Sequence, residues 1–202
     1  MKNKSIILIL LLMLSFVGNA QYEEWGTGKI YLKDGTTLEG LVRFYYFVDG
    51  PLFSNEKMRY KTERNKPSKK IAAKNVDSIN FDLPYIERIK GKNVKRTRKV
   101  TFLSIAKNKK KTKFGYAELV IDGKVKLLKR SYVDGRTTMA KRQTLFLREG
   151  GMVNTFDNLK SFKKFAQKYF SDCPALCAKI EKNVFRRKDA EKIAEFYNSS
   201  CN

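Results

Sequence analysis

The period of the apolar residues changes once along this chain, and that change constrains the fold more than any other feature of the sequence. Up to about residue 152, short apolar segments alternate with polar residues and are separated by turn dipeptides such as Asp34-Gly35 and Asp122-Gly123. This pattern predicts antiparallel strands joined by hairpins. From residue 157 the period becomes 3.6, which is typical of helices that bury one face. We therefore expect an α+β fold.

The β-rich domain is expected to cover residues 21–152 and to form hairpins, a sheet or an open barrel. One hairpin joins residues 29–33 to residues 38–47, where Gly40 indicates a bulge or a close backbone approach and the aromatic residues 44–47 indicate a packed core. A second joins 114–121 to 124–133 through Asp122-Gly123, which favours a type I′ turn. Shorter strands are expected at 58–60, 78–81, 100–105 and 144–148, with one helical turn at 72–76.

Residues 153–202 are expected to form three helices that pack on the β-rich domain. The first begins after Asp157 as its N-cap, the second runs from Pro174 to about Lys182, and the third begins near Asp189. The apolar face of the first helix contains Leu159, Phe162, Phe165, Ala166, Tyr169 and Phe170, and that of the third contains Ala190, Ile193, Ala194 and Tyr197.

The first 20 residues have the layout of a secretory signal peptide that is cleaved before Gln21. Lys2 and Lys4 precede an apolar run from Ile6 to Phe16, and small residues follow it. This run of about 12 residues is shorter than the roughly 20 that span a bilayer. No cysteine follows the run, so a bacterial lipoprotein is not expected. We expect an exported protein of the periplasm or the extracellular space, with no transmembrane segment after cleavage.

The cysteines of this chain are Cys173, Cys177 and Cys201. In an oxidising compartment a disulfide is expected, with one thiol left over. If the last two helices are antiparallel, Cys201 comes to lie beside Cys173, while Cys177 lies one turn further along and is the competing partner. The CxxxC spacing differs from the CxxC of redox enzymes, which favours a structural bond over redox or metal chemistry.

The chain contains no histidine, which excludes Ser/His/Asp and Cys/His triads, histidine-ligated zinc and a histidine pH switch. Carboxylate pairs hydrolyse glycosides without histidine, but the candidates Asp49, Glu56, Asp77 and Asp82 cannot be paired from the sequence. No motif indicates a metal or another cofactor. We therefore expect a protein that is not an enzyme, with a histidine-free glycan hydrolase as the less favoured alternative.

The charge is the unusual feature of the composition. There are 43 Lys+Arg against 20 Asp+Glu, a net charge of +23, which becomes 41 − 20 = +21 without Lys2 and Lys4. Two basic runs stand out beside a basic loop at 64–70: Arg88, Lys90, Lys92, Lys95, Arg96, Arg98 and Lys99 form the first, and Lys107, Lys109, Lys110, Lys111 and Lys113 form the second.

These runs predict a basic belt that contacts an anionic envelope polymer (lipopolysaccharide or an acidic glycan) or an acidic partner protein. Nucleic acid is less favoured, because aromatic residues interleave poorly with the runs. The alternative is a structural or assembly module whose charge is incidental, serving solubility and protecting strand edges.

Three segments also resemble an uncharacterised family of exported Bacteroidota proteins. They are Gly28-Lys29-Ile30-Tyr31-Leu32-Lys33-Asp34-Gly35-Thr36 with Gly40, the segment from Phe114 to Lys129, and Asp172-Cys173-Pro174-Ala175-Leu176 followed by Tyr197-Asn198 and Cys201. The resemblance covers most of the chain after the signal peptide and implies a cell-envelope location and a similar fold. Because the two outer cysteines recur in that family, it also implies a Cys173–Cys201 disulfide and a free thiol at Cys177.

Overall fold

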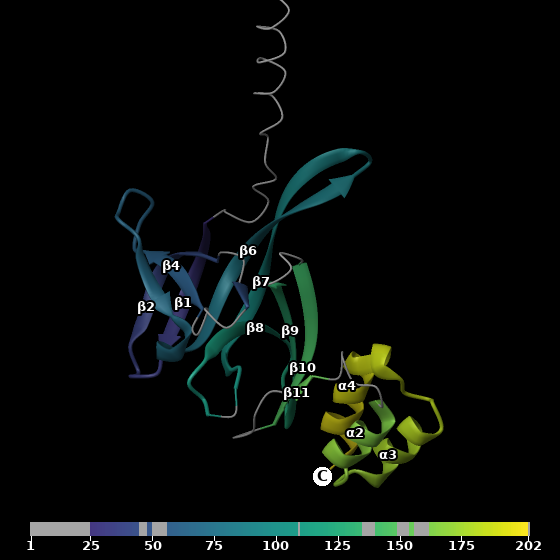
Figure 1. Ribbon diagram of the computed structural model, residues 1–202. Coiled ribbons are helices and arrows are strands. Elements are labelled where there is room, and N and C mark those ends of the chain that lie inside the picture. Colours follow the sequence, from purple (N-terminus) through teal and green to yellow (C-terminus); the bar gives the residue numbers. More distant parts are fainter. Residues whose placement is uncertain are drawn as a thin grey trace, which may run out of the picture.

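The computed structural model describes residues 25–44, 48–49, 56–108, 110–134, 140–148, 154–155 and 162–201. The expected signal peptide, the aromatic residues 45–47 and the expected helix start at Asp157 lie outside these residues. The described residues form a large, mostly antiparallel sheet followed by three α-helices (Figure 1). The α+β fold with a C-terminal helical tail is therefore confirmed.

The strands of the sheet are β1 (Gly26–Leu32), β2 (Thr37–Arg43), β3 (Val48–Asp49), β4 (Lys57–Lys61), β5 (Lys69–Ala72), β6 (Val76–Ile89), β7 (Lys92–Ala106), β8 (Phe114–Ile121), β9 (Val125–Asp134), β10 (Ala140–Arg148) and β11 (Asn154–Thr155). Their order is β11-β10-β9-β8-β7-β6-β1-β2-β4-β5, and β3 pairs in parallel with the end of β9. The helices are α2 (Phe162–Tyr169), α3 (Pro174–Glu181) and α4 (Ala190–Ser200), and the 3-10 turns are η2 (Ala73–Asn75) and η3 (Arg187–Asp189).

One predicted turn differs in the structure. The turn at Asp122-Gly123 is not of type I′, because only Gly123 of this pair has a positive φ. The side chain of Asn198 lies against this turn, where it donates to the carbonyl oxygens of Asp122 and Val125 and accepts the Val125 N–H. The type I′ pattern, with two positive φ angles of 48° and 79°, occurs instead at Lys90-Gly91 between β6 and β7.

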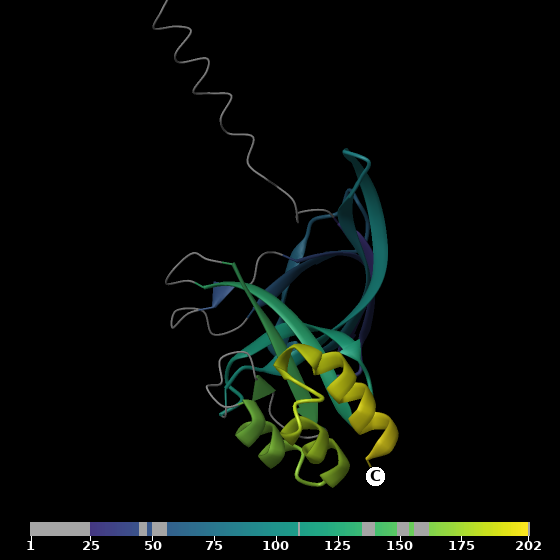
Figure 2. The ribbon, with the colours of Figure 1, turned by 90° about the vertical axis from the view of Figure 1, so that its right-hand side faces the viewer.

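The sheet curls around an apolar cluster, and the curvature is visible in Figure 2. The cluster includes Ile30, Val42, Met58, Tyr60, Ile79, Phe81 and Tyr116 from five of the strands. The curl returns the β5 edge to β8. Ala73 N–H donates to the Glu56 carbonyl (2.8 Å), and Glu56 N–H donates to the Phe114 carbonyl (3.0 Å). The result is a barrel-like body with a seam between β8 and the segments that flank β4 and β5.

The side chain of Glu56 closes the same seam. Its carboxylate accepts the Tyr116 N–H at 2.8 Å and forms ion pairs with Arg130 of β9 and with Lys107, which follows β7. The side chains of Glu56 and Arg130 are only 4% and 2% exposed. A Cβ at Gly115 would lie 2.7 Å from both carboxylate oxygens, so this position requires glycine.

The three helices cover one face of the β8–β10 part of the sheet (Figure 2). Leu127 and Phe146 of the sheet pack against Phe170, Leu176 and Ile193 in a second buried cluster. The apolar faces expected for the first and third helices are confirmed where the structure describes them, since Ala166, Phe170, Ile193, Ala194 and Tyr197 are all buried. Among the described residues, no helix has the length and apolar character needed to cross a membrane.

Replacing Glu56 by Gln should lower the free energy of unfolding by about 3–5 kcal/mol, because the buried guanidinium of Arg130 and the half-buried ammonium of Lys107 lose the carboxylate that they share. Urea unfolding followed by circular dichroism measures this loss. The matched control is Glu39→Gln, which breaks an exposed ion pair with Lys29 (43% and 69% exposed) and should cost at most about 1 kcal/mol. Equal losses in the two variants would contradict the structural role of Glu56.

Candidate functional site

The strands β6 and β7 extend past the rest of the sheet as a two-stranded arm (Figure 1). β1 follows β6 only as far as Phe81, and β8 follows β7 only from Phe102. In the described part of the chain, residues 82–89 and 92–99 therefore pair only with each other. We call residues 82–99 the basic arm, because all seven residues of the first predicted run lie on it.

The inner face of the basic arm continues the barrel core through Phe81 and Val100, which are directly opposite each other and buried. Because strand side chains alternate and opposite residues share a face, Arg96 and Arg98 lie on this inner face. Arg98 forms a two-bonded ion pair with Glu118 of β8, at 2.5 and 2.9 Å. Arg96 pairs with Glu87 at 2.9 Å. The arginines of the inner face are thus balanced by carboxylates.

The outer face of the basic arm carries Arg88, Lys95 and Lys99. Their directly opposite residues are Asn93, Ile86 and Asp82. All three basic side chains are exposed, and so is Lys90 at the turn. The Asp82 carboxylate accepts a hydrogen bond from the Thr27 hydroxyl at 2.7 Å. Lys92, which is opposite Ile89, belongs to the inner face. Each face of the arm carries three basic residues and one carboxylate. Because Glu118 of β8 adds a second carboxylate to the inner face, the outer face has the larger net positive charge.

The second basic run lies at the other end of β7. This strand has 15 residues, so its ends are about 45 Å apart along the chain at about 3.3 Å per residue. Lys107 belongs to the buried seam, Lys110 and Lys111 are exposed, Lys113 is half-buried, and Lys109 lies outside the described residues. The single belt expected from the sequence is thus divided, because an extended strand separates the two runs.

The carboxylates that the sequence offered for hydrolysis are not gathered in the described structure. Glu56 belongs to the barrel seam, and the side chain of Asp49 lies outside the described residues. Asp77 and Asp82 are five residues apart on β6, about 16 Å along the strand, whereas glycosidase carboxylates are about 5–10 Å apart. Within the described ranges, no group of three or more acidic or cysteine side chains is placed to hold a metal ion.

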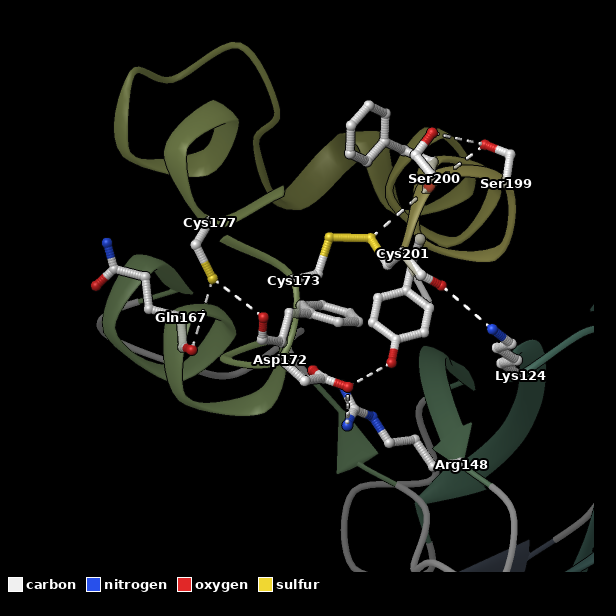
Figure 3. Close-up of a disulfide and its surroundings, with 12 residues drawn as sticks. Lys124, Arg148, Gln167, Asp172, Cys173, Cys177, Ser199, Ser200 and Cys201 are labelled. Atoms are coloured by element: carbon white, nitrogen blue, oxygen red, sulfur yellow. Dashed lines mark hydrogen bonds and ion pairs between the residues drawn. A yellow bond between two sulfur atoms is a disulfide. The ribbon is translucent and has the colours of Figure 1, made fainter. Parts of the chain in front are cut away.

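The C-terminal cysteines have the pairing that the resemblance implied. Cys173 before α3 and Cys201 after α4 form a disulfide, with Cα atoms 5.5 Å apart (Figure 3). The thiol of Cys177 is free of any disulfide and donates to the Phe170 carbonyl at 3.2 Å. Burial and the nearby charge of Asp172 raise the pKa of this thiol, which lowers its reactivity as a nucleophile.

Asp172 and Asn198 tie the helices to the sheet. The Asp172 carboxylate accepts a hydrogen bond from the Tyr197 hydroxyl (2.6 Å). It also forms an ion pair with Arg148 of β10 (2.9 Å; Figure 3). Arg148 also lies over the ring of Tyr169, 4.7 Å from its centre. Asn198 holds the β8–β9 turn at the other side. The residues of the C-terminal motif therefore have structural roles in this fold.

Comparisons with models of protein families, with curated proteins and with solved structures find no match to this chain. The assignment of the site therefore depends on the geometry described above.

The contacts of the Asp172 carboxylate with Tyr197 and Arg148 should weaken in acid. Burial opposes ionisation of this carboxyl, but the hydrogen bonds from Tyr197 and Arg148 outweigh it, so its pKa lies below the ordinary value. These contacts therefore stabilise the fold fully above the ordinary carboxyl pKa, and this stabilisation is lost as the pH falls through the lowered one. We expect the urea midpoints of the wild type and Asp172→Asn to differ at pH 6 and to converge towards pH 3. A difference that stays constant with pH would contradict this role.

Proposed function

We propose that this protein is an exported, non-enzymatic protein of the cell envelope that binds an anionic surface polymer through the outer face of its basic arm. The observation that carries this proposal is the separation of charges on the arm. Glu87 and Glu118 pair with Arg96 and Arg98 on the inner face, whereas Arg88, Lys95 and Lys99 share the outer face with Asp82 as its acidic residue.

This arrangement suits a polyanion. Lys95 and Arg88 are diagonal neighbours across the two strands, about 7–8 Å apart at their backbones, and Lys99 continues the series along β7. Exposed cations on an extended arm bind such a chain by releasing its counterions. The residues of the outer face between these cations, Pro84, Ile86 and Thr97, provide no aromatic ring for stacking on a base, which favours an acidic glycan or lipopolysaccharide over nucleic acid.

Export is supported by two observations of different kinds. The sequence has the layout of a signal peptide, and a disulfide joins the ends of the last two helices. Disulfides persist in oxidising compartments and are rare in the cytosol. A structural or assembly module with incidental charge is the competing function, and an acidic partner protein is the competing ligand.

Titration of the exported chain against lipopolysaccharide, polygalacturonate and duplex DNA over a salt series tests this proposal. The arm variant is Arg88→Glu/Lys95→Glu/Lys99→Glu. We expect at least about a tenfold loss of affinity for the preferred polymer at physiological salt, because three surface contacts of about 0.5–1 kcal/mol each are lost and replaced by repulsion.

The matched control is Lys110→Glu/Lys164→Glu/Lys192→Glu, which changes the net charge equally at exposed positions away from the arm. This control should keep most of the affinity, and both variants should melt near the wild type. Equal losses in the two variants, or release of all three polymers at low salt by the wild type, would contradict the proposal and favour incidental charge.

A further inference from the structure

A second group of cations lies on the sheet beside the basic arm. Arg43 of β2 is directly opposite Arg59 of β4, and Arg59 is directly opposite Lys70 of β5. Lys61 of β4 lies two residues further along the same face, opposite Leu41. These side chains point away from the core, because their sequence neighbours Val42, Tyr60 and Ile71 are buried. We call Arg43, Arg59, Lys61 and Lys70 the cationic row.

Trp25 positions two members of the cationic row. The guanidinium of Arg43 lies 5.0 Å from the centre of its ring and the ammonium of Lys61 lies 4.4 Å from it. Such cation–π contacts stabilise charged groups near an aromatic face. Like charges directly opposite each other do not stabilise a sheet, so strand pairing alone does not account for the cross-strand series from Arg43 to Lys70.

The cationic row and the outer face of the arm lie on the same face of the sheet. The strand registers join the two groups in one line across the sheet. From β4, Lys61 is opposite Leu41 of β2, and Leu41 is opposite Thr27 of β1. On the far side of β1, Asp82 of β6 is opposite Lys99 of β7. The hydrogen bond from Thr27 to Asp82 links β1 to β6 on this face. Four intervals of about 4.8 Å separate β4 from β7, or about 19 Å.

From Lys99, the outer face continues along the arm to Arg88. Asp82, opposite Lys99, and Arg88 are six residues apart on β6, which corresponds to about 20 Å. The cationic row and the arm together therefore extend over about 40 Å, with a change of direction at the base of the arm.

We propose that the cationic row and the outer face of the arm bind one linear acidic polysaccharide chain as a continuous track. This inference rests on the proposed function and identifies its ligand as a chain with repeated negative groups. A compact anionic head group would occupy either part alone, whereas a chain that reaches both makes the second contact intramolecular. Joining two weak sites in this way raises affinity by about 10²–10⁴ when the linker spans them.

Oligogalacturonates of increasing defined length test the track. For the wild-type exported chain at physiological salt, we expect weak binding of short oligomers and a rise of at least about 100-fold in affinity once an oligomer spans both parts. The row variant Lys61→Glu/Lys70→Glu should bind short oligomers with an affinity within about threefold of the wild type, because they contact the arm, but its affinity should no longer increase with oligomer length. The matched control Lys110→Glu/Lys164→Glu should keep the increase of affinity with length.

Trp25 gives a second test that leaves the net charge unchanged. Trp25→Leu should reduce the rise with length by disordering Arg43 and Lys61, whereas Trp25→Phe should keep part of it because the aromatic face remains. Thermal melting of each variant checks that the fold is intact.

The outcomes separate the two proposals. If the affinity of the row variant still increases with oligomer length while the arm variant loses binding, the proposal of a continuous track is wrong and the arm alone is the site. If lipopolysaccharide binds but affinity for oligogalacturonates does not depend on length, a compact head group is the ligand and the proposal of a continuous track is again wrong. If no polymer binds the wild type at physiological salt, the proposed function itself fails.

Discussion

The carboxylate of Glu56 holds together parts of the chain that are far apart in the sequence. It accepts the Tyr116 N–H and pairs with Arg130 and Lys107, while its backbone bonds to Phe114 and Ala73. These contacts fix the β5 edge of the sheet to β8 and close the barrel-like body. Because Lys107 directly follows β7, the seam also anchors the strand whose opposite end forms the arm.

The distribution of acidic residues determines where the excess positive charge appears. Glu56 lies in the seam, Glu118 pairs with Arg98, and Asp172 joins α4 to β10. Glu39 pairs with Lys29 at the centre of the outer face. Basic residues on either side of that pair, on β4–β5 and on the arm, therefore dominate the outer face. This division of roles explains how a chain of net charge +23 combines a defined fold with a cationic surface.

The sequence predicted the elements whose signal is local. The helices around Pro174 and after Asp189 were predicted because their apolar period and their first-turn residues are short-range features. The apolar face predicted for the third helix is confirmed by the burial of Ile193 and Ala194. The Cys173–Cys201 pair followed from the family resemblance, and the structure brings the start of α3 and the end of α4 together at this bond.

Features that depend on distant residues could not be predicted in the same way. The side chain of Asn198 contacts the Asp122-Gly123 turn. Lys107, a member of the second basic run, forms an ion pair with Glu56, which lies 51 positions earlier in the sequence. The cationic row requires the registers of three strands, and its local signal was only the alternation of Arg43, Arg59 and Lys70 with buried neighbours.

The most direct measurement is a lysine-reactivity footprint of the exported chain, with and without saturating polygalacturonate, read by mass spectrometry. The account requires protection of Lys61, Lys70, Lys95 and Lys99, with unchanged reactivity at Lys110, Lys164 and Lys192. Uniform protection of all exposed lysines, or protection centred on Lys110 and Lys111, would contradict the claim that the outer face of the sheet and the arm is the binding surface.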